Sequence, residues 1–156
     1  MTATEAAYLA GIIDGEGCIH ARVKSGKTVV VALSVGMVHR PTIDWIATTT
    51  GGGRVAPYAK SKTGNYRRAW LVMFGAHRAC DVLRQTLPFM VTKKREAELV
   101  IELMDLRAEL SGGSRRRGMP SGAVGRPSKL SLAPEKQMDI INAIAAEKKR
   151  GFEKVS

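Results

Sequence analysis

The chain alternates between strand-like and helix-like hydrophobic patterns. Apolar residues occupy every second position along residues 18–24, and residues 28–37 are rich in β-branched side chains. The turn sequence Ser25-Gly26-Lys27 separates these two segments, so they predict a β-hairpin. Residues 54–60 and 66–74 repeat this arrangement around Thr63-Gly64-Asn65, which is typical turn chemistry. The pattern therefore predicts two hairpins of similar size.

Helical spacing of apolar residues predicts five helices. The first is rich in Ala and Leu, and Thr4 can cap its start. Pro41 can occupy the first turn of the second helix, and Pro88 ends the third. The expected helices span residues 5–15, 41–51, 76–87, 92–110 and 134–149.

The order of these elements is α-β-β-α-β-β-α, followed by additional helices. Two hairpins that are each closed by a helix predict an α+β domain with one four-stranded antiparallel sheet. We expect a core over residues 1–110, a basic linker or arm rich in Gly, Ser and Pro over residues 111–133, and a C-terminal helix within residues 134–156.

Charge narrows the class of partner. The 156 residues hold 25 Lys and Arg against 14 Asp and Glu, which gives a formal net charge of +11 and a pI of about 10.1. With 44% hydrophobic residues the chain can form a core, which excludes disorder from end to end. A polyanion, most often nucleic acid, is the expected partner.

Membrane and secretory classes are not expected. No apolar run approaches the roughly 20 residues of a membrane span, and the N-terminus has no basic region typical of a signal peptide. The two cysteines, Cys18 and Cys80, cannot form a disulfide scaffold, and neither lies in a Cys-x-x-Cys pair. An intracellular location is therefore expected.

The first helix carries the motif that indicates a function. Residues 9–17 read Leu-Ala-Gly-Ile-Ile-Asp-Gly-Glu-Gly and resemble the LAGLIDADG motif of homing endonucleases. Six of the nine letters match, and Ile12, Gly15 and Glu16 differ. The order of elements, the glycines at 51–53, and Pro88-Phe89 followed by a basic cluster extend the resemblance over about 110 residues.

Glu16 is the candidate metal ligand. A carboxylate at the C-terminal end of a helix is not explained by the helix dipole, which favours cations there. A divalent metal such as Mg²⁺ is a suitable partner, since it takes one or two carboxylates together with phosphate oxygens. The resemblance implies that Glu16 is catalytic, that it binds Mg²⁺ or Mn²⁺, and that the Gly15 carbonyl adds a ligand.

Small residues on the same helix predict a close contact. Gly11 and Gly15 lie four residues apart, with Ala7 one turn earlier, which allows two helix backbones to approach. This stripe packs either on the chain's own sheet or on a second copy. The resemblance implies a homodimer in which the motif helices pair through Ala7, Gly11, Asp14 and Gly15. Asp14 is alternatively a structural hydrogen-bonding residue at the end of the helix.

Basic residues after Pro88-Phe89 are further catalytic candidates. The resemblance places a basic residue at the start of the following helix, facing the active site, and Lys93 is the best match, with Lys94 second. Either would stabilise charge on a phosphate, or simply contact phosphate or solvent. The family often has Gln or Asn after the second strand to position water. Met37 cannot do this, whereas His39 has the required chemistry.

The outer faces of the hairpins are the candidate DNA-binding surface. An antiparallel sheet with basic side chains fits the major groove, and Arg suits contacts to guanine. Each residue taken alone is equally well a solvated surface charge. From the hairpins we expect contacts by His20, Arg22, Lys24, Ser34, Arg54, Tyr58, Lys60, Lys62, Arg67 and Arg68, with the facing residue of the last pair undecided. Lys94 and the linker residues Arg115, Arg116, Arg117 and Arg126 complete the set.

Three functions follow from these patterns. The first is a homodimeric, metal-dependent, site-specific DNA endonuclease that cuts both strands at a long pseudo-palindromic site. The second is a regulator of the same fold that binds DNA without cutting it. The third is an RNA-splicing maturase. The basic linker either contacts DNA or joins the last helix, and its Gly125-Arg126-Pro127 sequence resembles the core of an AT-hook.

Overall fold

The computed structural model describes residues 1–24, 28–58, 68–110 and 134–150. Its elements run α1 (Ala3–Glu16), β1 (Gly17–Lys24), β2 (Thr28–Met37), α2 (Arg40–Thr49), β3 (Arg54–Tyr58), β4 (Ala69–Gly75), α3 (Ala76–Thr86), a short 3₁₀ helix η1 (Leu87–Phe89), α4 (Lys94–Leu110) and α5 (Pro134–Arg150). Five α-helices and four strands in this order confirm the predicted α+β class.

The four strands form one antiparallel sheet in the order β1-β2-β4-β3. Strands β1 and β2 pair without a bulge from Gly17 opposite Val35 to Lys24 opposite Thr28. Strand β4 lies between β2 and β3, with Ser34 opposite Met73 and Met73 opposite Arg54. Each hairpin therefore contributes an inner strand and an edge strand.

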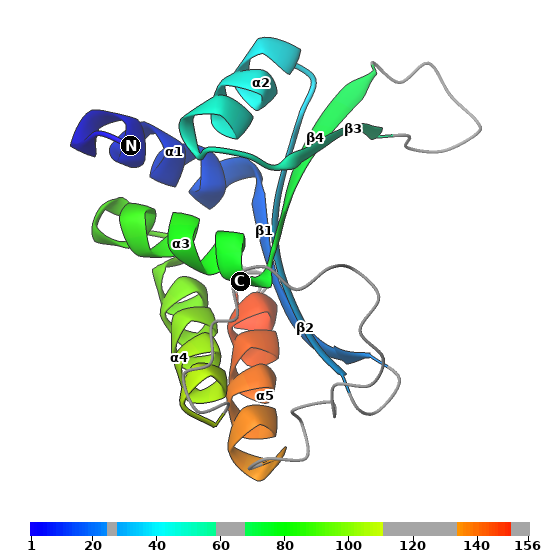
Figure 1. Cartoon of the computed structure of the whole chain (residues 1–156), viewed down its shortest axis with the longest axis vertical. Coiled ribbons are helices and arrows are strands. Elements are labelled where there is room, and N and C mark those ends of the chain that lie inside the picture. Colours follow the sequence, from blue (N-terminus) through cyan, green and yellow to red (C-terminus); the bar gives the residue numbers. More distant parts are fainter. Residues whose placement is uncertain (25–27, 59–67, 111–133, 151–156) are drawn as a thin grey trace, which may run out of the picture.

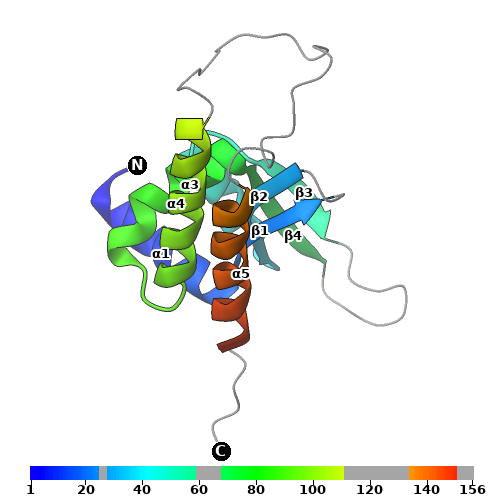
Figure 2. The same cartoon turned by 90° about the horizontal axis from the view of Figure 1, so that it is seen from below.

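Helices cover one face of the sheet (Figures 1 and 2). Because successive strand residues point to opposite faces, Ile19, Leu33, Val35, Val72 and Phe74 all point to the helices, where they are buried. They meet apolar residues of α1, α3 and α4 in one continuous core. No described helix covers the opposite face, which is called the outer face below.

The first helix begins two residues earlier than the apolar pattern indicated. Thr2, and not Thr4, is its N-cap, and the Thr2 hydroxyl accepts a hydrogen bond from the Glu5 amide. The Glu5 carboxylate accepts one from the Thr2 amide at 2.7 Å, which completes a capping box. Expecting Thr4 as the cap was wrong because the sequence Thr2-x-x-Glu5 carries the reciprocal partner, whereas Thr4 has Ala7 three residues later.

The C-terminal helix α5 packs beside α4 and touches β1 (Figure 2). Ile141 and Ile144 are buried in this contact. They join the same core as the sheet residues. Helix α5 is thus part of the same hydrophobic core as the sheet.

The junction between α1 and β1 requires glycine at position 17. A Cβ added to Gly17 would lie 2.5 Å from the Ile13 carbonyl oxygen and 2.9 Å from Ile13 Cγ2. We expect Gly17→Ala to lower the free energy of unfolding by about 1–3 kcal/mol, as overpacking does. Gly75→Ala is the matched control, because an added Cβ there meets no atom within 4 Å. Urea denaturation measures both changes, and equal stability of the two variants would contradict this account of the junction.

Candidate nucleic-acid interface

The motif carboxylate lies at the end of α1, where the first strand begins. Glu16 is the last residue of this helix and is exposed, as is Gly15 before it. Among the described residues, Glu16 has no hydrogen-bond or ion-pair partner. The helix end carries partial negative charge, so the exposed Glu16 carboxylate lies where a cation is favoured.

The Asp14 carboxylate binds backbone groups of its own chain. Its carboxylate accepts hydrogen bonds from the backbone amides of Val91 (2.7 Å), Thr92 (3.2 Å) and Lys93 (2.9 Å). These amides belong to the segment between η1 and the start of α4. Asp14 therefore has the structural helix-end role that the sequence left open, and this carboxylate is occupied within one chain.

Lys93 completes the same contact in the opposite direction. Its ammonium donates hydrogen bonds to the carbonyl oxygens of Ile13 (3.0 Å) and Asp14. A cation at the C-terminal end of a helix is favourable because it faces the partial negative charge of the carbonyls. Lys93 is thus beside the motif, as expected, but its ammonium is held by the helix end. Lys94 is exposed.

The stripe of small residues on α1 faces outward. Ala7, Gly11 and Gly15 are exposed, while Leu9, Ala10 and Ile13 of the same helix are buried. A Cβ added at Gly11 or Gly15 would meet no atom within 4 Å. Packing on the chain's own sheet is therefore wrong as the explanation of these glycines, because nothing in the described chain approaches them.

The outer face of the sheet has basic edges. On β1 the exposed residues are Cys18, His20, Arg22 and Lys24, as the alternating pattern predicted. On β3 the exposed residues of this face include Arg54 and Tyr58. Ser34 of β2 lies between them, opposite Cys18. Among the described strand residues, none of this face is acidic.

One expected DNA contact, Arg68, lies away from the outer face. Arg68 stacks on the Trp70 ring at 5.9 Å, and Arg40 lies 4.0 Å from the centre of the same ring. Trp70 packs against the core on the helix side, so this places Arg68 toward the helices. Lys60, Lys62, Arg67, Arg115, Arg116, Arg117 and Arg126 lie outside the described residues.

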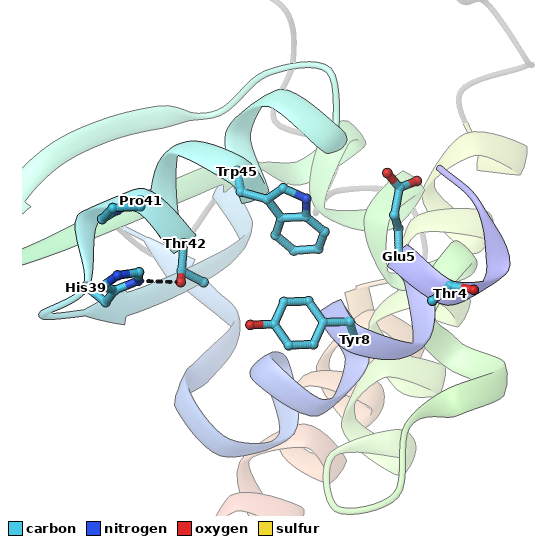
Figure 3. A pocket seen from close by; sticks show the side chains of 7 residues that line it. All are labelled: Thr4, Glu5, Tyr8, His39, Pro41, Thr42 and Trp45. Atoms are coloured by element: carbon cyan, nitrogen blue, oxygen red, sulfur yellow. Dashed lines mark hydrogen bonds between the residues drawn. The ribbon is translucent and has the colours of Figure 1, made fainter.

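The segment after β2 turns away from the outer face. Met37 packs against the core, and His39 Nδ1 lies 2.8 Å from the Thr42 hydroxyl. His39 lines a groove of about 410 Å³ between α1 and α2, where Tyr8 and Trp45 meet edge to face at 5.1 Å (Figure 3). His39 therefore lies in this groove, hydrogen-bonded to Thr42.

Lys148 is a residue near the motif that sequence reasoning missed. Its ammonium lies 3.8 Å from the Sγ atom of Cys18, a residue two positions after Glu16. The same Sγ atom lies 4.0 Å from His20 Nδ1. Partial burial of the ring, and then the charges of Lys148 and Arg22, hold the pKa of His20 below its ordinary value. The sequence carried no signal for this contact, because residues 111–133 separate Lys148 from the core.

The comparisons with known proteins support the fold alone. No family model and no curated protein matches the sequence. Among solved structures, the archaeal intron-encoded homing endonuclease I-Vdi141I in complex with DNA matches over 98% of this chain and 89% of its own, with 15% identity and a TM-score of 0.65. The chain has the homing-endonuclease fold.

Two further structures show how much of each relative the chain spans. The homing endonuclease I-CvuI, in complex with its target, is 20% identical and matches over 92% of this chain and 96% of its own, with a TM-score of 0.55. The meganuclease I-SmaMI bound to DNA is 14% identical, with a TM-score of 0.56, and matches over 90% of this chain but 43% of its own. The homing-endonuclease fold of this chain thus spans nearly all of some relatives and less than half of others.

The contact between Asp14 and residues 91–93 should contribute strongly to the stability of this homing-endonuclease fold. We expect Asp14→Ala to lower the free energy of unfolding by about 2–3 kcal/mol, since three hydrogen bonds to a charged group are lost. Asp44→Ala is the control, because Asp44 makes one exposed ion pair with Arg40, typically worth about 0–1 kcal/mol. Urea denaturation of both variants tests this. An Asp14 variant as stable as the Asp44 variant would contradict it.

The position of Lys148 can be tested through the titration of His20. We expect NMR to give His20 a pKa below its ordinary 6.5. Lys148→Met should raise this pKa, because a nearby positive charge disfavours the imidazolium. Lys149→Met, which changes an exposed neighbour, should leave it unchanged. An identical His20 titration in both variants would show that α5 does not bring Lys148 to β1.

Proposed function

We propose that this protein is an intracellular, homodimeric, metal-dependent DNA endonuclease of the LAGLIDADG type. The observation that carries the proposal is the exposed Glu16 carboxylate at the end of a helix whose small-residue face is open, next to a basic sheet face. The matched homing endonucleases are bound to DNA in their structures, which supports duplex DNA as the substrate here.

Dimerisation is part of the proposal because one chain supplies one motif carboxylate, Glu16. Among the described residues, no group of three His, Cys, Asp or Glu side chains could hold a metal ion. Two chains that meet at Gly11 and Gly15 bring two Glu16 carboxylates together about a two-fold axis. The chain spans nearly all of I-CvuI but less than half of I-SmaMI, which supports one chain as half of the assembly.

The residues at the end of α1 fit Mg²⁺ or Mn²⁺. Glu16 offers a carboxylate without another partner among the described residues, and the Gly15 carbonyl adds a hard oxygen donor. Both are ligands of the kind that Mg²⁺ prefers, and they would hold it together with phosphate oxygens and water. A bound metal supplies an activated water and stabilises the leaving oxygen during phosphodiester hydrolysis.

The remaining residues position the substrate and the carboxylate. Lys93 holds the carbonyl end of α1 and so fixes the direction in which Glu16 projects. Arg22, Lys24 and Arg54 on the outer face bind the duplex, and Lys94 contacts phosphate. Twice the +11 charge of one chain acts on one duplex, so affinity falls steeply as salt rises.

A non-cleaving DNA-binding regulator is the second candidate. It is favoured by Met37, which packs against the core where the family often has an amide to position water. The two functions share DNA binding and differ only in hydrolysis. An RNA-splicing maturase differs from both in its substrate, so preferential binding of structured RNA over duplex DNA would favour that third function.

Glu16→Gln separates cleavage from binding. A target is first selected from a pool of random DNA duplexes, and supercoiled plasmid carrying it is incubated with protein and Mg²⁺. We expect Glu16→Gln to lower the cleavage rate at least about 100-fold, because a neutral amide stabilises the charge of a metal site poorly. The affinity for the target should stay within a few-fold of wild type.

The control for this experiment is Glu102→Gln, which neutralises an exposed carboxylate on α4 and should cut at the wild-type rate. Cleavage by Glu16→Gln at that rate would overturn the metal assignment. A selected target that the wild-type protein binds but never cuts, with Mg²⁺ or Mn²⁺, would favour the regulator.

The open face of α1 predicts the effect of a bulky residue on self-association. We expect Gly11→Leu to fold as the wild type does, since an added Cβ meets no atom within 4 Å and Leu favours helix more than Gly does. It should weaken the dimer at least about 10-fold, because a close approach of two helices tolerates only small residues. Sedimentation equilibrium measures the dissociation constant of the dimer. The control is Ala145→Leu, which places the same side chain at an exposed position of α5. An unchanged dimer in Gly11→Leu would exclude this helix from the interface.

A further inference from the structure

The outer face of the sheet is apolar along its middle. The two inner strands, β2 and β4, turn the partly exposed side chains of Val30, Ala32, Leu71 and Met73 to this face. We call these four residues the apolar strip. The basic side chains described above stand on the edge strands β1 and β3.

The pairing register sets each strip residue beside a definite neighbour. Val30 lies opposite Arg22, and Ala32 lies opposite His20. Met73 lies opposite Arg54 on one side and Ser34 on the other. Leu71 lies between Gly36 and Ala56, so this row of the sheet offers no side-chain hydrogen bond.

Charge indicates what covers the strip. An apolar strip between basic edges, with no acidic residue among the described strand positions of the face, is complementary to a polyanion that displays some apolar surface. The floor of the DNA major groove fits this description. Phosphates line its two sides, and the thymine 5-methyl group is the one apolar group that its base edges display.

Apolar side chains at the groove floor discriminate between bases. A guanine, cytosine or adenine edge placed under Leu71 or Met73 would lose water from its hydrogen-bonding groups without gaining a partner, which is unfavourable. A thymine methyl instead gains buried apolar contact. Arg22 and Arg54, beside the strip, suit guanine N7 and O6.

We infer that the apolar strip reads thymine methyl groups, so that each half-site of the target carries thymines opposite Val30, Leu71 and Met73, flanked by guanines opposite Arg22 and Arg54. The inference rests on the proposed function, since it assumes that duplex DNA occupies the outer face. It adds which bases the sheet selects and by which contact.

The test removes single methyl groups from the DNA and leaves the protein unchanged. Wild-type protein in EDTA selects its target from random duplexes, and each thymine of the target is then replaced in turn by uracil, which lacks only the 5-methyl group. We expect two or more thymines per half-site at which uracil lowers the affinity about 3- to 5-fold, the value for one buried methyl group. Uracil at thymines outside the contacted bases should leave the affinity unchanged, which serves as the internal control.

Variants assign the contacts to side chains. Leu71→Ala should abolish the preference for thymine over uracil at one position of each half-site and keep it at the others. Arg22→Ala should weaken binding, but the ratio of the affinities for thymine and uracil at the Leu71 position should stay unchanged. Failure to select any sequence would overturn the proposed function. A selected target in which no uracil replacement changes the affinity, or which lacks thymine, would overturn the inference and leave the proposed function standing.

Discussion

The reciprocal contact between the end of α1 and the segment before α4 determines where the motif carboxylate points. Asp14 binds the amides of residues 91–93, and Lys93 binds the carbonyls of Ile13 and Asp14. The Asp14 carbonyl lies in the last turn of α1, where carbonyls lack a partner within the helix, and the three amides lie in the segment before α4. With residues 13 and 14 held, Glu16 is left outside the contact and exposed.

The two-residue period of the strands provides the second constraint. It sends Ile19, Leu33 and Phe74 to the helices and leaves the alternate residues on a face that no described helix covers. The same alternation thereby builds the core and the candidate DNA-binding surface. Helix α1 divides in a comparable way, with Leu9 and Ile13 buried and Gly11 open. Each element that forms the proposed site therefore also contributes to the core.

Local patterns predicted most of this arrangement. The alternation over residues 18–24, the turn after it and the resemblance around Glu16 were sufficient for the hairpins, the sheet and the fold, which the structure confirms. These features depend on neighbours in sequence. The outward direction of Gly11 and Gly15 was left open because a stripe of small residues packs equally well inside a chain and between chains.

Contacts between distant segments could not be predicted. The ammonium of Lys93 was expected to face a phosphate, and its partners proved to be carbonyls about 80 residues away in sequence. Arg68 lies over the Trp70 ring, whereas the pattern left open which of Arg67 and Arg68 faces outward. Lys148 reaches Cys18 through the packing of α5 on α4, which depends on the whole core.

In the proposed function, one chain of this protein is half of a DNA-cleaving site. Native mass spectrometry of the wild-type protein on its selected duplex, with cleavage prevented by EDTA, tests this most directly, because it counts the chains on one DNA molecule. We expect two chains per duplex at saturation, with no stable complex of one chain. A complex of one chain with one duplex, at concentrations where that duplex is cut after Mg²⁺ is added, would contradict it.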